Sequence, residues 1–217
     1  MGKHFTSIVE LPETIPVFPL AGALLLPHTD LPLNIFEPRY LEMVETAMAG
    51  QRLIGMIQPM AGDSSETPAL SAVGCLGRII SYSESRDDRL QIVLEGVCRF
   101  RVVREAGVAT PYRQAHVSYS DFAADLSVAS QANSVNRPAV IKAFRQYLEA
   151  NNMTANWEEV DRIPSDILVN TLSQLAPYDA AEKQALLEAD DVQTRADMLI
   201  ALTELALSKP AGKMRLQ

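Results

Sequence analysis

Cysteine is scarce in this chain of 217 residues, which argues against a fold held together by disulfide bonds. Cys75 and Cys98 each lie in an apolar, strand-like segment, so we interpret them as buried, reduced thiols. No apolar run approaches the roughly 20 residues that a membrane-spanning helix needs, and the chain does not open with a basic region followed by an apolar core. We therefore expect a cytoplasmic protein with no membrane partner.

Basic residues are also few. The chain has 19 Lys and Arg against 27 Asp and Glu, a formal net charge of −8. This balance disfavours nucleic acid as a partner, because binding a phosphate backbone calls for clustered positive charge. Arginines do recur in the predicted strands, and we interpret them as paired with Glu84, Glu95 and Glu105; a basic stripe that binds RNA is the alternative. These arginines are Arg78, Arg89, Arg99, Arg101, Arg104 and Arg113.

The motifs of several enzyme classes are missing. No G-x-x-x-x-G-K-S/T loop is present to hold the phosphates of ATP, and no G-x-S-x-G marks a nucleophilic serine. His4, His28 and His116 lie far apart, outside any metal-ligand spacing. We therefore predict that the chain is not an enzyme and needs neither a cofactor nor a metal.

An organised stretch runs from residue 18 to residue 58. Residues 23–26 form an apolar run that predicts a buried strand, ended by Pro27. Residues 31–35 alternate apolar and polar, which predicts a half-buried strand, and Pro32 requires that strand to lie at a sheet edge or a bulge. Pro38 begins a predicted helix that ends near Gly50, and residues 53–57 read as another buried strand.

More strands are predicted over residues 73–83, 89–95, 97–103 and 112–119, with Gly96 as a break. Gly74 and Gly77 indicate a bulge or a close approach of backbone. Residues 59–68 have the composition of a surface loop. Strands at this spacing, with one helix inserted early, predict a small barrel of about six strands.

The composition then changes. Residues 121–135 are rich in small polar residues without a period, which predicts a linker. Four helices follow, near residues 136–151, 165–175, 179–187 and 190–207, and Asp179 with Glu182 predicts a capping box. The expected organisation is a β-barrel subdomain over 1–120, the linker, a helical bundle over 136–208 and a flexible tail over 209–217.

Several segments carry a resemblance to a known family, the Lon protease N-terminal domain. They are residues 18–20 (FPL), 26–27 (LP), 31–40 (LPLNIFEPRY), 74–79 (GCLGRI), 94–100 (LEGVCRF) and 182–188 (EKQALLE). In this family a glycine often follows the proline where this chain has His28. The resemblance implies an α+β fold, with a small PUA-like β-barrel that has an inserted helix and is followed by a C-terminal helical bundle. It also implies a standalone substrate-binding module without ATPase or protease domains.

That resemblance implies a non-catalytic module that binds unfolded or hydrophobic protein segments, as an adaptor or together with a protease. Apolar residues of the first loops are the candidate contacts, because methionine-rich surfaces adapt to varied apolar partners. We interpret most of these residues as core, with an exposed minority near Pro27 and Met60 forming a groove. The candidate peptide-binding residues are Leu26, Pro27, His28, Leu31, Met56, Pro59 and Met60. Two alternatives stay open: an RNA-binding PUA-like module, and a small-ligand site at the junction of barrel and bundle.

Overall fold

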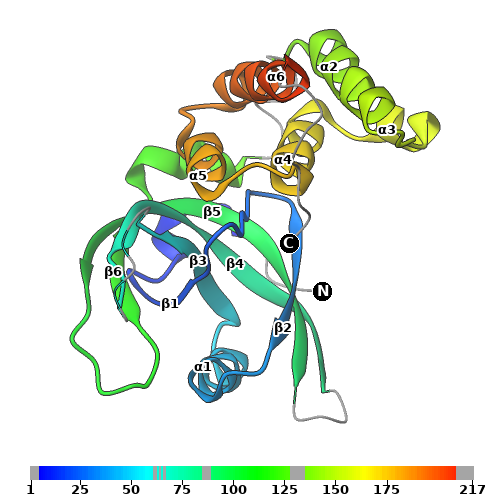
Figure 1. Cartoon of the computed structure of the whole chain (residues 1–217). Coiled ribbons are helices and arrows are strands. Elements are labelled where there is room, and N and C mark those ends of the chain that lie inside the picture. Colours follow the sequence, from blue (N-terminus) through cyan, green and yellow to red (C-terminus); the bar gives the residue numbers. More distant parts are fainter. Residues whose placement is uncertain are drawn as a thin grey trace.

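A mixed β-sheet forms the first half of the molecule, and helices form the second (Figure 1). The computed structural model describes residues 5–60, 63, 65, 67–84, 89–127 and 135–208, so the predicted tail lies outside it. The strands are β1 (Thr14–Pro19), β2 (Asp30–Ile35), β3 (Leu53–Pro59), β4 (Leu70–Glu84), β5 (Leu90–Glu105) and β6 (Gln114–Ser118). The helices are η1 (Ile8–Glu10), α1 (Pro38–Ala49), η2 (Ser120–Leu126), α2 (Arg137–Ala150), α3 (Trp157–Arg162), α4 (Ser165–Leu175), α5 (Ala180–Glu188) and α6 (Val192–Ser208). The predicted α+β class is confirmed.

The six strands follow the order β2-β5-β4-β3-β1-β6, and β5 pairs in addition with β6. Strand β5 has two neighbours on one side because it is long: its first half pairs with β2 and its second half with β6. The pairings therefore lead from β5 through β4, β3, β1 and β6 back to β5. Only the β1–β3 pair is parallel among these pairings, which makes the sheet mixed.

Strand β2 lies at the edge of the sheet and has β5 as its neighbour in the strand order. Pro32 is opposite Val93 in this pairing. An edge strand accommodates proline because no further strand requires its missing N–H. The edge position predicted from Pro32 is confirmed.

Residues 23–26 do not form the predicted strand. They are a loop, although Leu24, Leu25 and Leu26 are at most 2% exposed. The loop crosses β5 at Gly96, where the amide of His28 donates to the Gly96 carbonyl. A short apolar run indicates burial but does not by itself distinguish a strand from another buried segment.

Gly96 does not break its strand either. Strand β5 continues through it, and the missing side chain makes room for the loop. A Cβ at this position would lie 2.0 Å from the carbonyl oxygen of Leu26. Gly74 and Gly77 allow similar close approaches, since a Cβ there would lie 2.4 Å from Phe100 and 2.8 Å from Leu25, respectively.

Helix α1 covers the side of the sheet opposite the other α-helices (Figure 1). Pro38 stands at its start, as predicted, because the first helical N–H has no partner within the helix. Its buried face is formed by Tyr40, Met43, Val44 and Ala47. The Tyr40 ring packs against Phe18 of β1 with 4.2 Å between ring centroids, which fixes the helix on the sheet.

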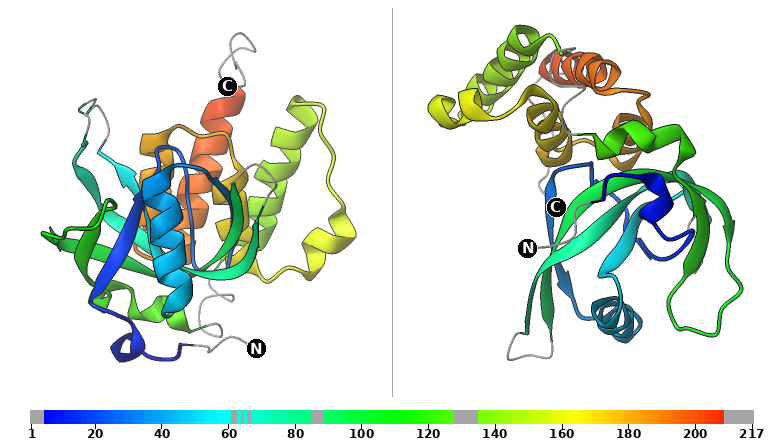
Figure 2. Two further views of the ribbon diagram at one scale, coloured as in Figure 1. Left: turned by 90° about the horizontal axis from the view of Figure 1, so that it is seen from below. Right: turned by 180° about the vertical axis from the view of Figure 1, so that it is seen from behind.

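The helical half contains the four predicted helices as α2, α4, α5 and α6, and also the short α3. The predicted capping box of α5 is confirmed: Asp179 accepts from the Glu182 amide, and the Glu182 side chain accepts from the Asp179 amide. Helix α3 was missed because it has six residues and no side-chain cap bond. No helix within the described ranges has the length and apolar composition required to span a bilayer. Figure 2 shows α2 and α3 projecting beyond the sheet on one side of α6.

The first part of the predicted linker is folded. Residues 120–126 form η2, which buries Phe122 and Asp125 against β5. The polar composition of this segment did not indicate that Asp125 is buried and paired with Arg99 of β5. Residues 128–134 lie outside the described residues, and the division of the chain at 121–135 stays a prediction.

Polar side chains join the two halves. Asn170 of α4 donates to the carbonyl of Pro27 at 3.0 Å, and Gln174, one turn further on, donates to the carbonyl of Asp30 at 2.7 Å. On the other side, Gln184 of α5 donates to the carbonyl of Val73 at 3.1 Å. Helices α4 and α5 are thus both hydrogen-bonded to the sheet half.

Candidate functional site

Three of the predicted binding residues belong to the core. Leu26 is fully buried, Met56 is 3% exposed, and Pro27 is buried beneath its contact with Asn170. Pro27 was expected on the surface, so that expectation is corrected: helix α4 covers it. Leu31 is half-buried on the edge strand β2. The buried side chains of Leu26, Pro27 and Met56 therefore offer no surface to a partner.

His28 is half-buried, and its side chain already makes a hydrogen bond. Its Nε2 lies 2.9 Å from the carbonyl oxygen of Asp125. Its φ of 61° is in the left-handed region that favours glycine, the residue found here in the pattern that the chain resembles. The His28 side chain therefore links this loop to η2.

Pro59 and Met60 line a pocket between β3, β4 and α5, which we call the junction pocket. It encloses about 370 Å³, and the Met60 side chain is 53% exposed. Its other lining residues are Gln58, Ser71, Ala72, Ala180, Ala181, Gln184, Ala185 and Glu188. Of the seven predicted residues, the structure brings only Pro59 and Met60 together in this pocket.

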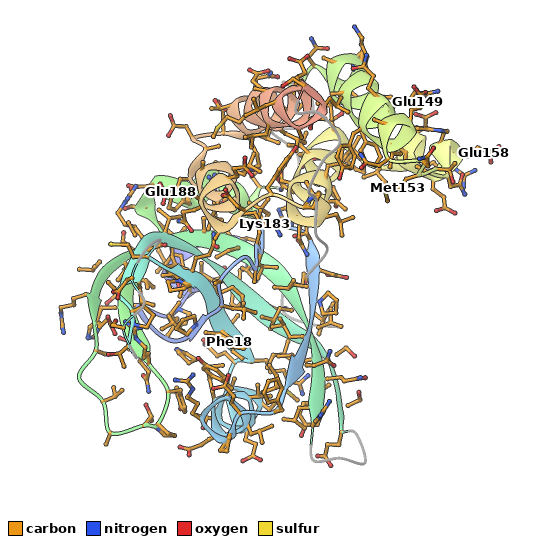
Figure 3. The ribbon with its side chains drawn as sticks, viewed as in Figure 1. Phe18, Glu149, Met153, Glu158, Lys183 and Glu188 are labelled. Atoms are coloured by element: carbon orange, nitrogen blue, oxygen red, sulfur yellow. The ribbon has the colours of Figure 1, made fainter. Side chains whose placement is uncertain are left out.

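The polar groups of the junction pocket are engaged with one another. Gln58 Nε2 donates to the carbonyl of Ala180 at 3.0 Å, and Gln184 Nε2 lies 2.7 Å from Glu188 Oε1. Nearby, Lys183 Nζ donates to the carbonyl of Gly22 at 2.9 Å, and burial lowers the pKa of Lys183. Figure 3 shows Lys183 and Glu188 on α5, above the sheet. The pocket therefore offers mixed polar and apolar contacts.

A second and far more apolar hollow lies within the helical half, and we call it the helical groove. It encloses about 330 Å³. Its lining residues are Val140, Ala143, Phe144, Tyr147, Leu148, Met153, Leu172, Leu175, Ala176, Pro177, Tyr178, Leu199, Ile200 and Thr203. None of these side chains carries a charge at neutral pH, so the groove suits apolar groups.

The helical groove exists because α6 packs against both α2 and α4. Each of the three helices contributes an apolar stripe, and the stripes face a common space. At the surface, Leu175 is 72% exposed and Met153 is 54% exposed. Large apolar side chains with this exposure beside an apolar hollow are typical of a protein-binding surface.

The hydroxyl groups of Thr203 and Tyr178 are hydrogen-bonded within the groove. Thr203 Oγ1 donates to the carbonyl of Leu199 at 2.7 Å and lies 2.8 Å from Tyr178 Oη. Burial raises the pKa of both Tyr178 and Tyr147, so these rings stay uncharged at neutral pH. The groove thus presents rings and aliphatic chains without unpaired charge.

Three of the six arginines in the predicted strands are engaged with acidic partners. Arg99 is 2% exposed and forms a bidentate pair with Asp125, with both N–O distances at 2.9 Å. Arg101 pairs with Asp121 at 2.9 Å. Arg113 pairs with Glu105, as predicted, and the other two pairs use partners that were not predicted.

Arg99 also binds the helical half, since its guanidinium donates to the carbonyls of Leu187 and Ala189 at the end of α5. A second buried arginine, Arg195, donates to the carbonyl of Leu186 and to Asn170 Oδ1, both at 2.8 Å. Burial and the nearby Arg99 lower the pKa of Arg195 to about 9. Arg99 thus connects β5 to the end of α5, whereas Arg195 connects α6 to α5 and α4 within the helical half.

Comparison with protein families gives a decisive match. The model described as the ATP-dependent protease La (LON) substrate-binding domain matches residues 14–204. The chain belongs to this family. The matched region of this Lon-type domain includes all six strands and the helices from α1 through most of α6.

Curated relatives agree with this assignment. The Lon protease of Syntrophus aciditrophicus is 26% identical over 202 residues, which cover 88% of this chain and 25% of that protein. The Lon protease of Dictyoglomus thermophilum is 28% identical over 201 residues, covering 89% of this chain and 24% of that protein. The Lon-type domain thus spans about a quarter of the length of these relatives.

Two solved structures have the same fold. The Lon N-terminal domain protein from Xanthomonas campestris matches with a TM-score of 0.62 and 24% identity, covering 87% of this chain and 97% of that one. The N-terminal domain of the Mycobacterium avium complex Lon protease matches with a TM-score of 0.65 and 16% identity, covering 88% and 98%.

The groove of this Lon-type domain was missed by sequence reasoning. Its walls come from residues 140–153, 172–178 and 199–203, most of which were predicted only as helices, with no binding role assigned. One signal was available, because Leu175 and Met153 sit at or beyond helix ends, where an apolar side chain is less easily covered. Among the described residues, no group of three His, Cys, Asp or Glu is arranged to hold a metal ion.

Proposed function

We propose that this Lon-type domain recognises protein substrates by binding their unfolded, apolar segments in the helical groove. The observation that carries the proposal is the uncharged lining of the groove together with the exposed Leu175 and Met153. Membership of a family described as substrate-binding supports it. In this proposal the domain catalyses nothing and acts as an adaptor or alongside a protease in the cytoplasm; two free, buried cysteines suit a reducing compartment.

The direct experiment is a fluorescence-anisotropy titration with a labelled, permanently unfolded polypeptide. The folded form of the same polypeptide and a structured RNA serve as controls. Saturable binding to the unfolded chain alone is the expected result, since only that chain exposes apolar segments. Absence of this binding, or tighter binding to the RNA, contradicts the proposal.

Replacing Leu175 and Met153 together with aspartate is expected to weaken binding of the unfolded polypeptide about tenfold or more. Two carboxylates at the mouth of an apolar groove must be desolvated when an apolar segment enters. Both side chains are more than half exposed, so the melting temperature should change little. Leu205→Asp is the matched control, because Leu205 is 49% exposed on α6 and does not line the groove. Equal loss in the control would argue against the groove.

The junction pocket is a second candidate site, either for a small ligand or for a side chain of the bound polypeptide. Its volume, the exposed Met60 and the carboxylate of Glu188 favour it. Met60→Asp separates the two uses in the titration above. Weaker binding of the unfolded polypeptide would assign Pro59 and Met60 to protein recognition, and unchanged binding would leave the pocket to a small ligand.

We also infer that the ring of strand pairings closes a small barrel of the PUA-like type. Barrels of that type occur in RNA-modifying proteins, which is the basis of the RNA-binding alternative. Three of the six arginines that supported it are engaged: Arg99 is buried, and Arg101 and Arg113 are paired with acidic residues, whereas Arg89 and Arg104 are exposed. The structured RNA in the titration tests this alternative.

A further inference from the structure

Negative charge is concentrated in the helical half. Residues 135–208 contain six Lys and Arg and twelve Asp and Glu, so this half holds −6 of the formal net charge of −8. Ten of the acidic side chains are exposed. They are Glu149, Glu158, Glu159, Asp161, Asp179, Glu188, Asp190, Asp191, Asp197 and Glu204.

The basic residues of this half do little to offset that charge at the surface. Arg195 is buried, Arg137 donates to the carbonyls of Val160 and Ile163 at 2.6 and 2.7 Å, and Lys183 is directed to Gly22. Three basic side chains are exposed, namely Lys142, Arg145 and Arg162, and Arg145 is stacked over the ring of Trp157. Exposed carboxylates thus outnumber exposed basic groups by ten to three.

Two of these carboxylates adjoin lining residues of the helical groove along the chain. Asp179 follows Tyr178, and Glu204 follows Thr203. Figure 3 shows Glu149 and Glu158 at the same end of the helical half as Met153. Acidic residues of α3, of α6 and of the segment before α5 are therefore neighbours of this uncharged groove.

We propose that the occupant of the helical groove is a protein segment whose large apolar side chains are flanked by lysine or arginine. This proposal rests on the proposed function and names its substrate class. In this proposal the apolar side chains cover the groove lining, and the flanking cations are attracted to the neighbouring carboxylates, an attraction that acts over a Debye length of about 8 Å at physiological salt. A second copy of this chain is a poor occupant, since it would bring the same excess of negative charge.

The experiment compares three labelled peptides with one apolar core and with lysine, serine or glutamate on both flanks. At low salt the lysine-flanked peptide should bind about tenfold more tightly than the glutamate-flanked one, as expected for a few exposed charge pairs. At about 1 M salt, where the Debye length is about 3 Å, the ratio should fall to about two or less.

Charge-reversal variants locate the effect. Glu158→Lys with Glu204→Lys should remove most of the preference for lysine flanks. The matched control is Glu42→Lys with Glu45→Lys, two exposed positions on α1, which covers the opposite side of the sheet (Figure 1). Both pairs change the net charge equally, so loss of the preference in the control would overturn the assignment to the groove.

The remaining outcomes separate this inference from the proposed function. If all three peptides bind equally, charge plays no part, and the inference is overturned while the proposed function stands. If the serine-flanked peptide and the unfolded polypeptide both fail to bind, both proposals are overturned. If only peptides with lysine flanks bind, and a lysine-flanked peptide with a polar core binds as tightly, the groove is not the site and the inference is overturned.

Discussion

Replacing Arg99 with leucine is expected to lower the free energy of unfolding by about 3–5 kcal/mol, the usual cost of removing one partner of a buried ion pair. Asp125, which is 6% exposed, would keep a buried carboxylate without its bidentate partner. The carbonyls of Leu187 and Ala189 would lose their donor at the same time. Urea denaturation followed by circular dichroism measures this loss.

The double variant Arg99→Leu with Asp125→Leu is the control for this result. It removes both charges, so it should recover a substantial part of the stability lost in the single variant. A single variant that loses less than about 1 kcal/mol would contradict the buried pair, because only exposed pairs contribute so little. The consequence for function is direct: Arg99 binds the end of α5, so its loss should also loosen the helical half against the sheet.

Gly96→Ala is expected to lower the free energy of unfolding by about 3 kcal/mol, at or above the upper end of what overpacking usually costs. The added Cβ would meet the carbonyl oxygen of Leu26 at 2.0 Å and its carbonyl carbon at 2.7 Å. Both are main-chain atoms of a buried loop, so no side-chain rotation relieves the contact. Chemical denaturation of the variant and the parent protein gives the difference.

Gly107→Ala is the matched control, since nothing lies within 4 Å of a Cβ built there and its effect on the free energy of unfolding should stay within about 0.5 kcal/mol.

Gly96→Ala also tests how the groove is positioned. The displaced loop contains Pro27, whose carbonyl accepts a hydrogen bond from Asn170 of α4. Helix α4 in turn forms one wall of the groove. We therefore expect weaker binding of the unfolded polypeptide in Gly96→Ala than in Gly107→Ala; a Gly96→Ala protein as stable as its control would contradict this packing.

Local signals in the sequence were sufficient for most elements. Pro38 marked the start of α1, Asp179 with Glu182 marked the start of α5, and Pro32 required an edge strand. Each of these signals acts within a few residues of the feature that it specifies, through a missing N–H or a side-chain cap. The segments that resemble the Lon N-terminal domain then led to the correct family.

Elements whose role depends on distant partners were predicted less well. The apolar run at 23–26 was expected to be a strand, and only the contact with Gly96 of β5 explains why it is a buried loop. Asp125 lay in a segment interpreted as linker, because nothing nearby in sequence indicates its pairing with Arg99. Short-range patterns carry no information on such pairings.

The same limit applies to the candidate site. The sequence by itself determined the α+β class, the order of most strands and helices, the acidic balance of the helical half and the Lon family. Only the tertiary structure decided which apolar residues remain exposed: Leu26, Pro27 and Met56 are buried, whereas Leu175 and Met153 border the groove. The physical reason is that an apolar stripe specifies a face to be covered, while the packing of α6 against both α2 and α4 determines where that covering is incomplete.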